Sequence, residues 1–260
     1  MKLEEVTFTN VGGLKTACID RKQLVELMAQ RVLDYNNPES NYYQKTMTIF
    51  SANGHSISIA NSDKEMGRLL NSADILHADG QSVVSFSRRF GENPIPERSA
   101  TTDTIHDYPL NITSNTRHYL LGAKQSTIEK CADIMSQNYK NFLIAGTRNG
   151  YFNIEENQAV VAGINKAKPD ILWVGLGKPK EQEFIRELKS SIDVPVIISC
   201  GGCYNFVTGE YKRAPEIMQK LGLEWLHRMA TEPKKLFWRY LTTNPHAIYC
   251  VVKHSRSSKS

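Results

Sequence analysis

Short apolar runs alternate with amphipathic stretches along most of the chain. The alternation is clearest in the second half, where near-continuous apolar runs occur at Phe142–Ala145, Ile171–Val174 and Val194–Ser199. Such runs are typical of strands that are covered on both faces. Amphipathic stretches at Ile154–Ala167 and Lys180–Lys189 separate them and predict helices. The pattern therefore predicts an α/β protein with a mostly parallel sheet.

The first half continues this alternation. Further predicted strands are Thr46–Ser51, Ile75–Ala78 and Arg117–Gly122. Further predicted helices are one that begins after Asp20 and carries Leu24, Leu27, Met28 and Val32, a short one from Asp63 through Leu70, and Ser126–Tyr139. Asp20 and Asp63 are of a residue type that suits a helix N-cap.

After Gly209 the pattern changes to helices. The predicted helices are Pro215–Leu221, Leu223–Met229 and, after the start signal Thr231-Glu232-Pro233, Lys234–Leu241, and a strand at Ala247–Val252 is expected to close the chain. We therefore expect two parts, an α/β body over residues 1–211 and a C-terminal appendage over residues 212–260.

The charge is divided unevenly between these two parts. The chain carries 32 Lys and Arg against 27 Asp and Glu, a formal charge of +5. Residues 212–260 hold ten of the basic and three of the acidic residues, so the appendage carries +7 and the body −2. A basic segment of this kind implies an anionic partner, which can be a nucleic acid, an acidic membrane face or a phosphate-bearing substrate.

The composition excludes several classes of protein. With 40% hydrophobic residues over 260 positions, the chain is neither disordered nor collagen-like nor a multi-span membrane protein. The start Met1–Glu5 is too polar for a signal peptide. The odd count of five cysteines then favours reduced thiols in a cytosolic protein.

Asp79 is the first candidate for chemistry. It follows the predicted strand Ile75–Ala78 and precedes a glycine turn and a helix. Open α/β sheets bind ligands at the carboxyl ends of their strands, where a carboxylate can act as a general base. Asp is also a preferred N-cap residue, and its position alone favours that structural role.

Two glycine-containing loops follow later strands. In Gly175-Leu176-Gly177-Lys178 the glycines would let the backbone approach a phosphate beside a helix N-terminus, although a tight structural turn fits equally well. Cys200-Gly201-Gly202-Cys203 is compatible with a dithiol redox motif, but a Gly-Gly loop flanked by incidental thiols is the favoured interpretation. The sequence has no Asp-X-Asp pair, which gives no support for a carboxylate-held divalent metal.

A series of short motifs runs in order between about Thr46 and Leu241. The motifs are Ser51-Ala52-Asn53, Ala73-Asp74, Ala78-Asp79-Gly80, Pro96-Glu97-Arg98, Leu120-Leu121-Gly122-Ala123, Gly150-Tyr151-Phe152, Pro169-Asp170-Ile171-Leu172 with Val174-Gly175-Leu176-Gly177, Gly201-Gly202, Arg213-Ala214-Pro215, Leu221-Gly222-Leu223-Glu224-Trp225-Leu226, Arg228 and Glu232-Pro233. Each motif alone is weak evidence. The ordered set resembles the WecG/TagA/CpsF family of bacterial glycosyltransferases.

The resemblance implies both an activity and a fold. It implies inverting, metal-independent transfer of a sugar from a UDP-sugar to a polyprenyl-diphosphate-linked saccharide, for an exopolysaccharide or another surface polysaccharide. It also implies a Rossmann-like α/β body with a C-terminal helical appendage, and no cofactor. The expected location is the cytoplasm, peripheral on the inner face of the bacterial membrane, and a homo-oligomer fits the family.

The resemblance also assigns roles to residues. Asp79 matches the family's proposed catalytic Asp, which would take the proton of the acceptor hydroxyl. Arg228 matches an appendage Arg thought to bind the donor's diphosphate, and Lys235 stands at a second such basic position. The residues expected to bind substrate are Ser51 (where many members have Thr), Asn53, Gln81, Arg98, Gly122, Gly175, Gly177, Lys178, Gln182, Gly201, Gly202, Arg213, Arg228 and Lys235.

Several positions beside the expected donor pocket depart from the family pattern. Glu181-Gln182 stands where many members have Gln-Glu, Tyr204-Asn205 stands where they have Phe-Asp, and Trp238 replaces a third appendage Arg. The donor sugar therefore stays open among glucose, N-acetylmannosamine and a uronic acid.

The basic tail has a more specific interpretation in this light. Lys234, Lys235 and Arg239 interleave with Leu236, Phe237, Trp238, Tyr240 and Leu241, a pattern that favours an interfacial helix on an anionic membrane surface but also suits packing on the body. Two alternatives come from other classes. One is a nucleic-acid-binding protein acting through the tail, although the tail lacks a known nucleic-acid-binding module. The other is a dithiol oxidoreductase built on Cys200 and Cys203.

Overall fold

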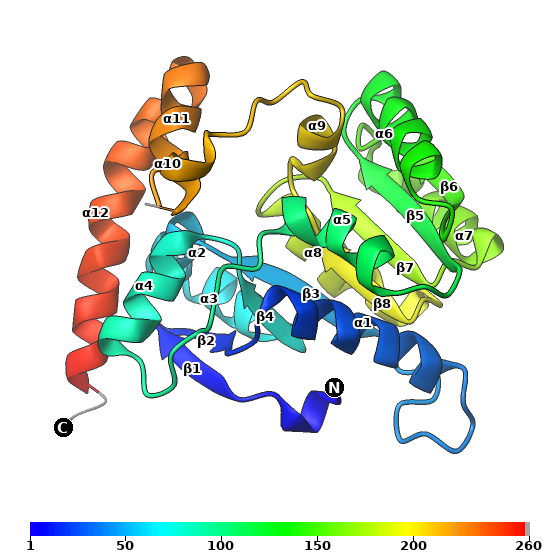
Figure 1. Cartoon of the computed structure of the whole chain (residues 1–260), viewed down its shortest axis with the longest axis horizontal. Coiled ribbons are helices and arrows are strands. Elements are labelled where there is room, and N and C mark those ends of the chain that lie inside the picture. The colour runs from blue at the N-terminus through cyan, green and yellow to red at the C-terminus, as the bar shows by residue number, and fades with distance from the viewer. Residues whose placement is uncertain (221, 258–260) are drawn as a thin grey trace. The chain divides into compact units, whose positions relative to one another are not determined.

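The computed structural model describes residues 1–220 and 222–257, without the side chains of Glu216, Lys220, Lys235, Arg256 and Ser257 (Figure 1). The strands in this part are β1 (Phe8–Val11), β2 (Leu14–Ala17), β3 (Met47–Ala52), β4 (Ile75–Ala78), β5 (Thr116–Gly122), β6 (Phe142–Arg148), β7 (Ile171–Gly175) and β8 (Val196–Ser199). The helices are α1 (Arg21–Tyr35), α2 (Gly54–Ser62), α3 (Lys64–Asn71), α4 (Gln81–Phe90), α5 (Thr101–Asn111), α6 (Gln125–Asn138), α7 (Asn157–Ala167), α8 (Lys180–Leu188), α9 (Cys203–Val207), α10 (Glu216–Lys220), α11 (Glu224–Thr231) and α12 (Pro233–Ser257).

The strands form two sheets among the described residues. β1 and β2 make an antiparallel hairpin, and the other strands make a parallel sheet in the order β4-β3-β8-β7-β5-β6, flanked by helices. The predicted Rossmann-like α/β fold is therefore confirmed. The predicted strands of the body are all present, and each begins or ends within three residues of its predicted bounds.

The chain divides into two compact units. The first contains Met1–Glu4, Lys22–Phe50 and Thr101–Tyr211, and the second contains Glu5–Arg21, Ser51–Ala100 and Lys212–Ser260. One border falls at Tyr211, where the sequence predicted the body to end. The appendage groups in the second unit with Glu5–Arg21 and Ser51–Ala100. The division into a body over residues 1–211 and an appendage over residues 212–260 stays a prediction.

In the first unit, β5 is the point at which the strand order reverses. β5 pairs in parallel with β6 on one side and with β7 on the other, and β8 follows β7. The chain thus passes from β5 outward to β6 and then returns to β7. In open α/β sheets such a reversal opens a crevice at the carboxyl ends of the strands, where ligands bind. The loops that begin at Gly122 and Gly175 lie at this reversal.

The core of the first unit contains a fully buried histidine, His118 in β5. Its Nδ1 accepts a hydrogen bond from Trp173 Nε1 at 3.1 Å, and its ring stacks on Phe142 with 3.5 Å between ring centroids. Burial holds the pKa of His118 well below its ordinary value. The folded protein therefore keeps this imidazole neutral.

We expect His118 to make the fold sensitive to mild acid. In the unfolded chain a histidine takes up a proton near pH 6.5, whereas folded His118 does not. The free energy of unfolding should therefore fall by up to about 1.4 kcal/mol for each pH unit below about 6.5. Urea unfolding at pH 7.5, 6.5 and 5.5 measures this slope. His118→Gln removes the titration, so a variant with an unchanged slope would contradict the prediction.

The second unit contains a hairpin and a helix, α2, that the sequence did not predict. β1 and β2 join through Gly12 and Gly13, both with positive φ, and β2 packs beside β4. The helix expected after the Asp79 turn is present as α4, which contacts β1. In the first unit, α5 was also not predicted, because its sequence contains Pro109 and a run of Thr residues.

The expected strand at Ala247–Val252 is wrong, because α12 continues as a helix to Ser257. The β-branched and aromatic residues of this segment favour a strand by propensity alone. Their positions at helical spacing instead bury Ala247, Cys250 and Val251, and α12 packs along α2 and α4 (Figure 1). Tertiary contacts therefore override local propensity here. No helix among the described residues is both long enough and apolar enough to cross a membrane.

Candidate active site

Asp79 lies directly after β4, and the backbone fixes its place. The amides of Asp79 and Gly80 both donate to Ala52 O at the end of β3, at 2.9 and 3.1 Å. The N-cap residue of α4 is Gly80, so Asp79 stands one residue before the cap position. Its carboxylate is half-buried at the carboxyl end of the strand.

Asn53 connects the end of β3 to Asp79. Its Oδ1 caps α2 by accepting from Ser56 N at 3.0 Å, which leaves Nδ2 to donate to Asp79 Oδ2 at 3.5 Å. A Cβ on Gly80 would lie 2.9 Å from Asn53 Cβ and 3.1 Å from its Cα. Only glycine at position 80 therefore allows Asn53 to approach the Asp79 turn this closely. Ser51, at the end of the same strand, is buried.

Contacts between the neighbours of Arg98 and the neighbours of Asp79 hold the two segments together. Ser99 N donates to Ala78 O at 2.9 Å, which pairs the chain around Arg98 with the end of β4. The side chains support this pairing, because His77 Nδ1 lies 3.2 Å from Ser99 Oγ and both residues are fully buried. Arg98 and Asp79 are thus neighbours in space although they are far apart in the sequence.

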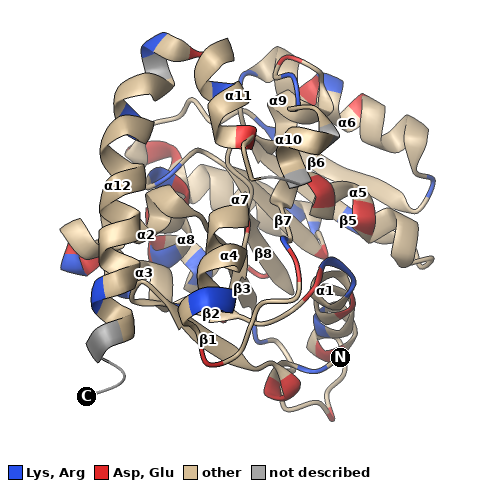
Figure 2. Ribbon diagram, turned by 60° about the vertical axis from the view of Figure 1, so that its left-hand side comes forward, with Lys and Arg blue, Asp and Glu red and all other residues tan. Residues whose placement is uncertain are grey.

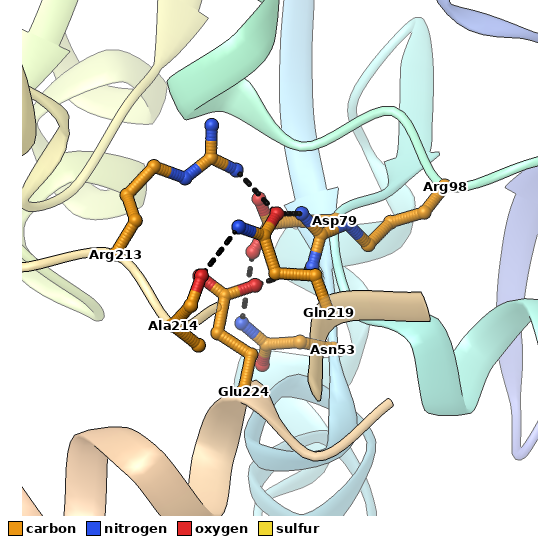
Figure 3. Close-up of polar contacts among 7 residues, drawn as sticks. All are labelled: Asn53, Asp79, Arg98, Arg213, Ala214, Gln219 and Glu224. Atoms are coloured by element: carbon orange, nitrogen blue, oxygen red, sulfur yellow. Dashed lines mark hydrogen bonds and ion pairs between the residues drawn. The ribbon is translucent and has the colours of Figure 1, made fainter. Parts of the chain in front are cut away.

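The appendage contributes a second arginine and a glutamine to this cluster (Figure 3). Gln219 Oε1 accepts from Arg213 Nη2 at 3.2 Å and from Arg98 Nη2 at 3.5 Å. Its Nε2 donates to Ala214 O at 2.7 Å, which fixes the orientation of the amide. Arg98 Nη1 also forms an ion pair with Glu224. Two arginines are therefore tied together beside the Asp79 turn.

The remaining appendage residues are placed by their helices. Gly222, just before α11, lies on Gln81, since a Cβ on Gly222 would come within 3.2 Å of Gln81 Cγ. Arg228 stands one helical turn after Glu224 in α11, and is half-buried. The side chain of Lys235 lies outside the described part of the structure, so its role stays a prediction.

In the first unit, the Gly175–Lys178 and Cys200–Cys203 loops share one buried carboxylate. Glu181 Oε2 accepts from Gly177 N at 3.1 Å and from Gly201 N at 3.0 Å. Gln182 Nε2 donates to Glu181 Oε1 at 3.1 Å. Burial raises the pKa of Glu181, and Lys178 opposes this by lowering it.

This contact changes the role expected of these loops. The backbone amides of Gly177 and Gly201, which a bound phosphate would need, already donate to the Glu181 carboxylate. The phosphate interpretation of the first loop then depends on the side chain of Lys178. Binding of a ligand by Gly177, Gly201, Gly202 and Gln182 stays a prediction.

The glycines at the strand ends permit close packing of the backbone. A Cβ on Gly122 would lie 2.2 Å from Gly175 O, and a Cβ on Gly175 would lie 2.8 Å from Gly201 O. Three loops at the carboxyl edge of the sheet therefore pack against one another through their main chains.

The cysteine pair does not have the features of a redox centre. Cys200 and Cys203 are only 6% and 1% exposed, and burial raises the pKa of the Cys200 thiol well above its ordinary value. Thiol–disulfide exchange needs an accessible thiolate. The dithiol oxidoreductase alternative is therefore disfavoured. Within the described part of the chain, no three His, Cys, Asp or Glu side chains come together as the ligands of a metal would.

The fold and the cluster together define an α/β enzyme with a carboxylate and arginines at the carboxyl end of a parallel sheet. The model of the WecG/TagA/CpsF glycosyl transferase family matches residues 9–260, and the chain belongs to this family. The protein is accordingly a glycosyltransferase of cell-surface polysaccharide synthesis. In general terms the family implies a sugar-nucleotide donor and a lipid-linked acceptor, which favours the glycosyltransferase over the nucleic-acid alternative.

The sequence did not assign a role to four residues that the structure places in these clusters. Gln219 and Glu224 join the arginines, Ser99 holds the Arg98 segment, and Glu181 joins the two loops. The partners of these side chains are distant in the sequence. The one local signal was an acidic residue in the first turn of α8, directly after a glycine loop whose amides it can reach.

Proposed function

We propose that the protein is an inverting hexosyltransferase that moves a sugar from a UDP-sugar donor to a polyprenyl-diphosphate-linked saccharide. The observation that carries the proposal is the Asp79 carboxylate at the end of β4, in one cluster with Arg98 and Arg213 (Figure 3). The transfer removes a proton from the acceptor and develops negative charge on the leaving diphosphate. A carboxylate and nearby guanidinium groups meet these two needs.

The proposed reaction is a single displacement. The acceptor hydroxyl attacks the anomeric carbon from the face opposite the diphosphate, and Asp79 takes its proton. As the new carbon–oxygen bond forms, the bond to the diphosphate oxygen breaks, which inverts the anomeric centre and releases UDP. Arg213 and Arg228 neutralise the departing charge, with Lys235 as a further cation. Because arginines can do this, the proposal includes independence from divalent metal.

The other expected binding residues fall into two groups. Ser51, Asn53 and Gln81 surround the Asp79 turn in the second unit, and we place the reacting sugar there. Gly122, Gly175, Gly201 and Gly202 belong to the loops at the strand reversal of the first unit, and ligand binding by these glycines stays a separate prediction. Lys178 adds positive charge to the same edge.

A panel of sugar nucleotides tests this function. UDP-glucose, UDP-N-acetylmannosamine and a UDP-linked uronic acid are each incubated with synthetic polyprenyl-diphosphate saccharides, and released UDP is measured. We expect release to require the lipid-linked acceptor and to persist in EDTA. Failure of every donor to release UDP would overturn the proposal, and loss of activity in EDTA would overturn its metal independence.

We also propose that α12 lies on the anionic inner face of the membrane. Its large exposed apolar residues fall on one side of the helix: Phe237, Trp238, Leu241, Ile248 and Tyr249. The opposite side, with Leu236, Ala247 and Val251, is buried against the second unit. α12 carries basic residues and no Asp or Glu (Figure 2). A helix with a second apolar side and a positive charge suits a lipid interface.

Vesicle sedimentation checks the membrane proposal. Removing Trp238, which is 70% exposed, together with Leu241 should weaken binding to phosphatidylserine-containing vesicles at least about tenfold, because each buried apolar side chain contributes more than about 1 kcal/mol. Leu110→Ala is the matched control, since Leu110 is 67% exposed in α5. Binding should also weaken with salt. Wild-type binding by the Trp238→Ala/Leu241→Ala variant would refute the proposal.

A further inference from the structure

The ion pair between Arg98 and Glu224 joins two parts of the second unit that are distant in sequence. Arg98 belongs to the segment that pairs with the end of β4, and Glu224 begins α11 in the appendage. The two side chains are only 13% and 19% exposed. A pair so shielded from water is costly to break, because a lone charge would stay buried. The pair is therefore a fixed attachment point and not a fluctuating surface contact.

Two further contacts act at the same place. Gln219, at the end of α10, accepts hydrogen bonds from both Arg98 and Arg213. Gly222, with a φ of +72°, lies directly on Gln81, the first residue of α4. These contacts lie beside the Asp79 turn (Figure 3). They come from α10, Gly222 and the start of α11.

We infer that Glu224 is a positioning residue that docks α10 and α11 at the catalytic turn and thereby sets the place of Arg228. Glu224 and Arg228 are four residues apart in one helix, so they share a face and are separated by about 6 Å along its axis. Fixing Glu224 on Arg98 fixes this spacing from the catalytic turn. In its role as a diphosphate ligand, Arg228 thus depends on an acid that touches no substrate. This inference rests on the proposed function.

The opposite role for Glu224 makes a different prediction. Two donors of Arg98 are engaged by Glu224 and Gln219. If the donor's diphosphate bound Arg98 in place of Glu224, the Glu224 carboxylate would compete with the donor. Removing the charge of Glu224 would then tighten donor binding. If Glu224 positions the appendage, removing its charge must weaken donor binding. The sign of the change in donor KM therefore separates the two roles.

The test compares Glu224→Gln with Glu92→Gln, a neutralised exposed acid in the same unit. For Glu224→Gln we expect donor KM to rise at least about tenfold, with kcat within about twofold of wild type, since binding and not proton transfer is affected. The Glu92→Gln variant should match wild type in both. A lower donor KM in Glu224→Gln, or an unchanged one, would overturn the inference.

Hydrogen exchange provides a measurement that does not need activity. Peptides covering α10 and α11 should exchange faster in Glu224→Gln and in Arg98→Gln than in wild type, while peptides covering α6 should not change. The double variant should exchange no faster than Arg98→Gln, because Arg98→Gln already removes the contact with Glu224 together with the one to Gln219. Additive effects would contradict the pairing. If no UDP-sugar is turned over by wild type, the proposed function fails, and exchange alone still decides whether Glu224 docks the appendage.

Discussion

Asp79→Asn should fold like the wild-type protein and lose about 10²- to 10⁴-fold in kcat, the usual contribution of a positioned general base. The substitution keeps the size of the side chain and its place after β4, where backbone bonds from Asp79 and Gly80 to Ala52 hold the turn. It removes the basic oxygen that receives the acceptor's proton. UDP release with a lipid-linked acceptor measures the loss, and urea unfolding checks the fold.

We expect Asp79→Asn to impair the transfer step and not the binding of UDP. Asp79 acts on the acceptor hydroxyl, so the affinity for UDP, measured by calorimetry, should stay near that of wild type. Asp133→Asn, an exposed acid on α6, is the matched control and should change neither quantity. Wild-type turnover by Asp79→Asn would remove Asp79 as the base. A large loss of UDP affinity would instead make Asp79 a binding residue.

The sequence predicted the elements whose local pattern and tertiary setting agree. β7 and β8 are buried on both faces, and their continuous apolar runs indicate strands without any knowledge of their neighbours. The segment Ala247–Val252 shows the opposite case. Its residues favour a strand, but His246 and His254 bond to Ser58 and Asn61 of α2, at 2.9 Å each, and hold the segment as part of α12. Such long-range partners are not encoded in local spacing.

In the candidate site, too, some features could be predicted from the sequence and others could not. Asp79 could be found because it ends a strand and precedes a glycine. The sequence could not show that the N-cap residue of the next helix is Gly80 and not Asp79, because Gly80 takes that position only in the folded turn. Glu181 was hidden for a related reason, since Gly177 and Gly201 meet it only when the ends of β7 and β8 lie side by side. Sequence motifs thus locate residues, and the folded backbone decides which of their groups are engaged.

Three glycines in the first unit should respond differently to alanine. At Gly122, which has a φ of +140°, a Cβ would meet the backbone of Gly175 at 2.2 Å, so the strand ends must move apart. Strain and overpacking together should lower the free energy of unfolding by at least about 3 kcal/mol. At Gly177 nothing lies within 4 Å, so only its φ of +78° opposes a side chain, at about 1 kcal/mol.

Gly163 completes the series with the opposite sign. It lies within α7, and a Cβ there would meet only Tyr119 Oη, at 3.9 Å. Alanine should therefore stabilise the protein by about 0.5–1 kcal/mol, the difference in helix propensity. Urea unfolding of Gly122→Ala, Gly177→Ala and Gly163→Ala gives the three values. If Gly122→Ala were no less stable than Gly177→Ala, main-chain packing between β5 and β7 could not be what requires glycine at position 122.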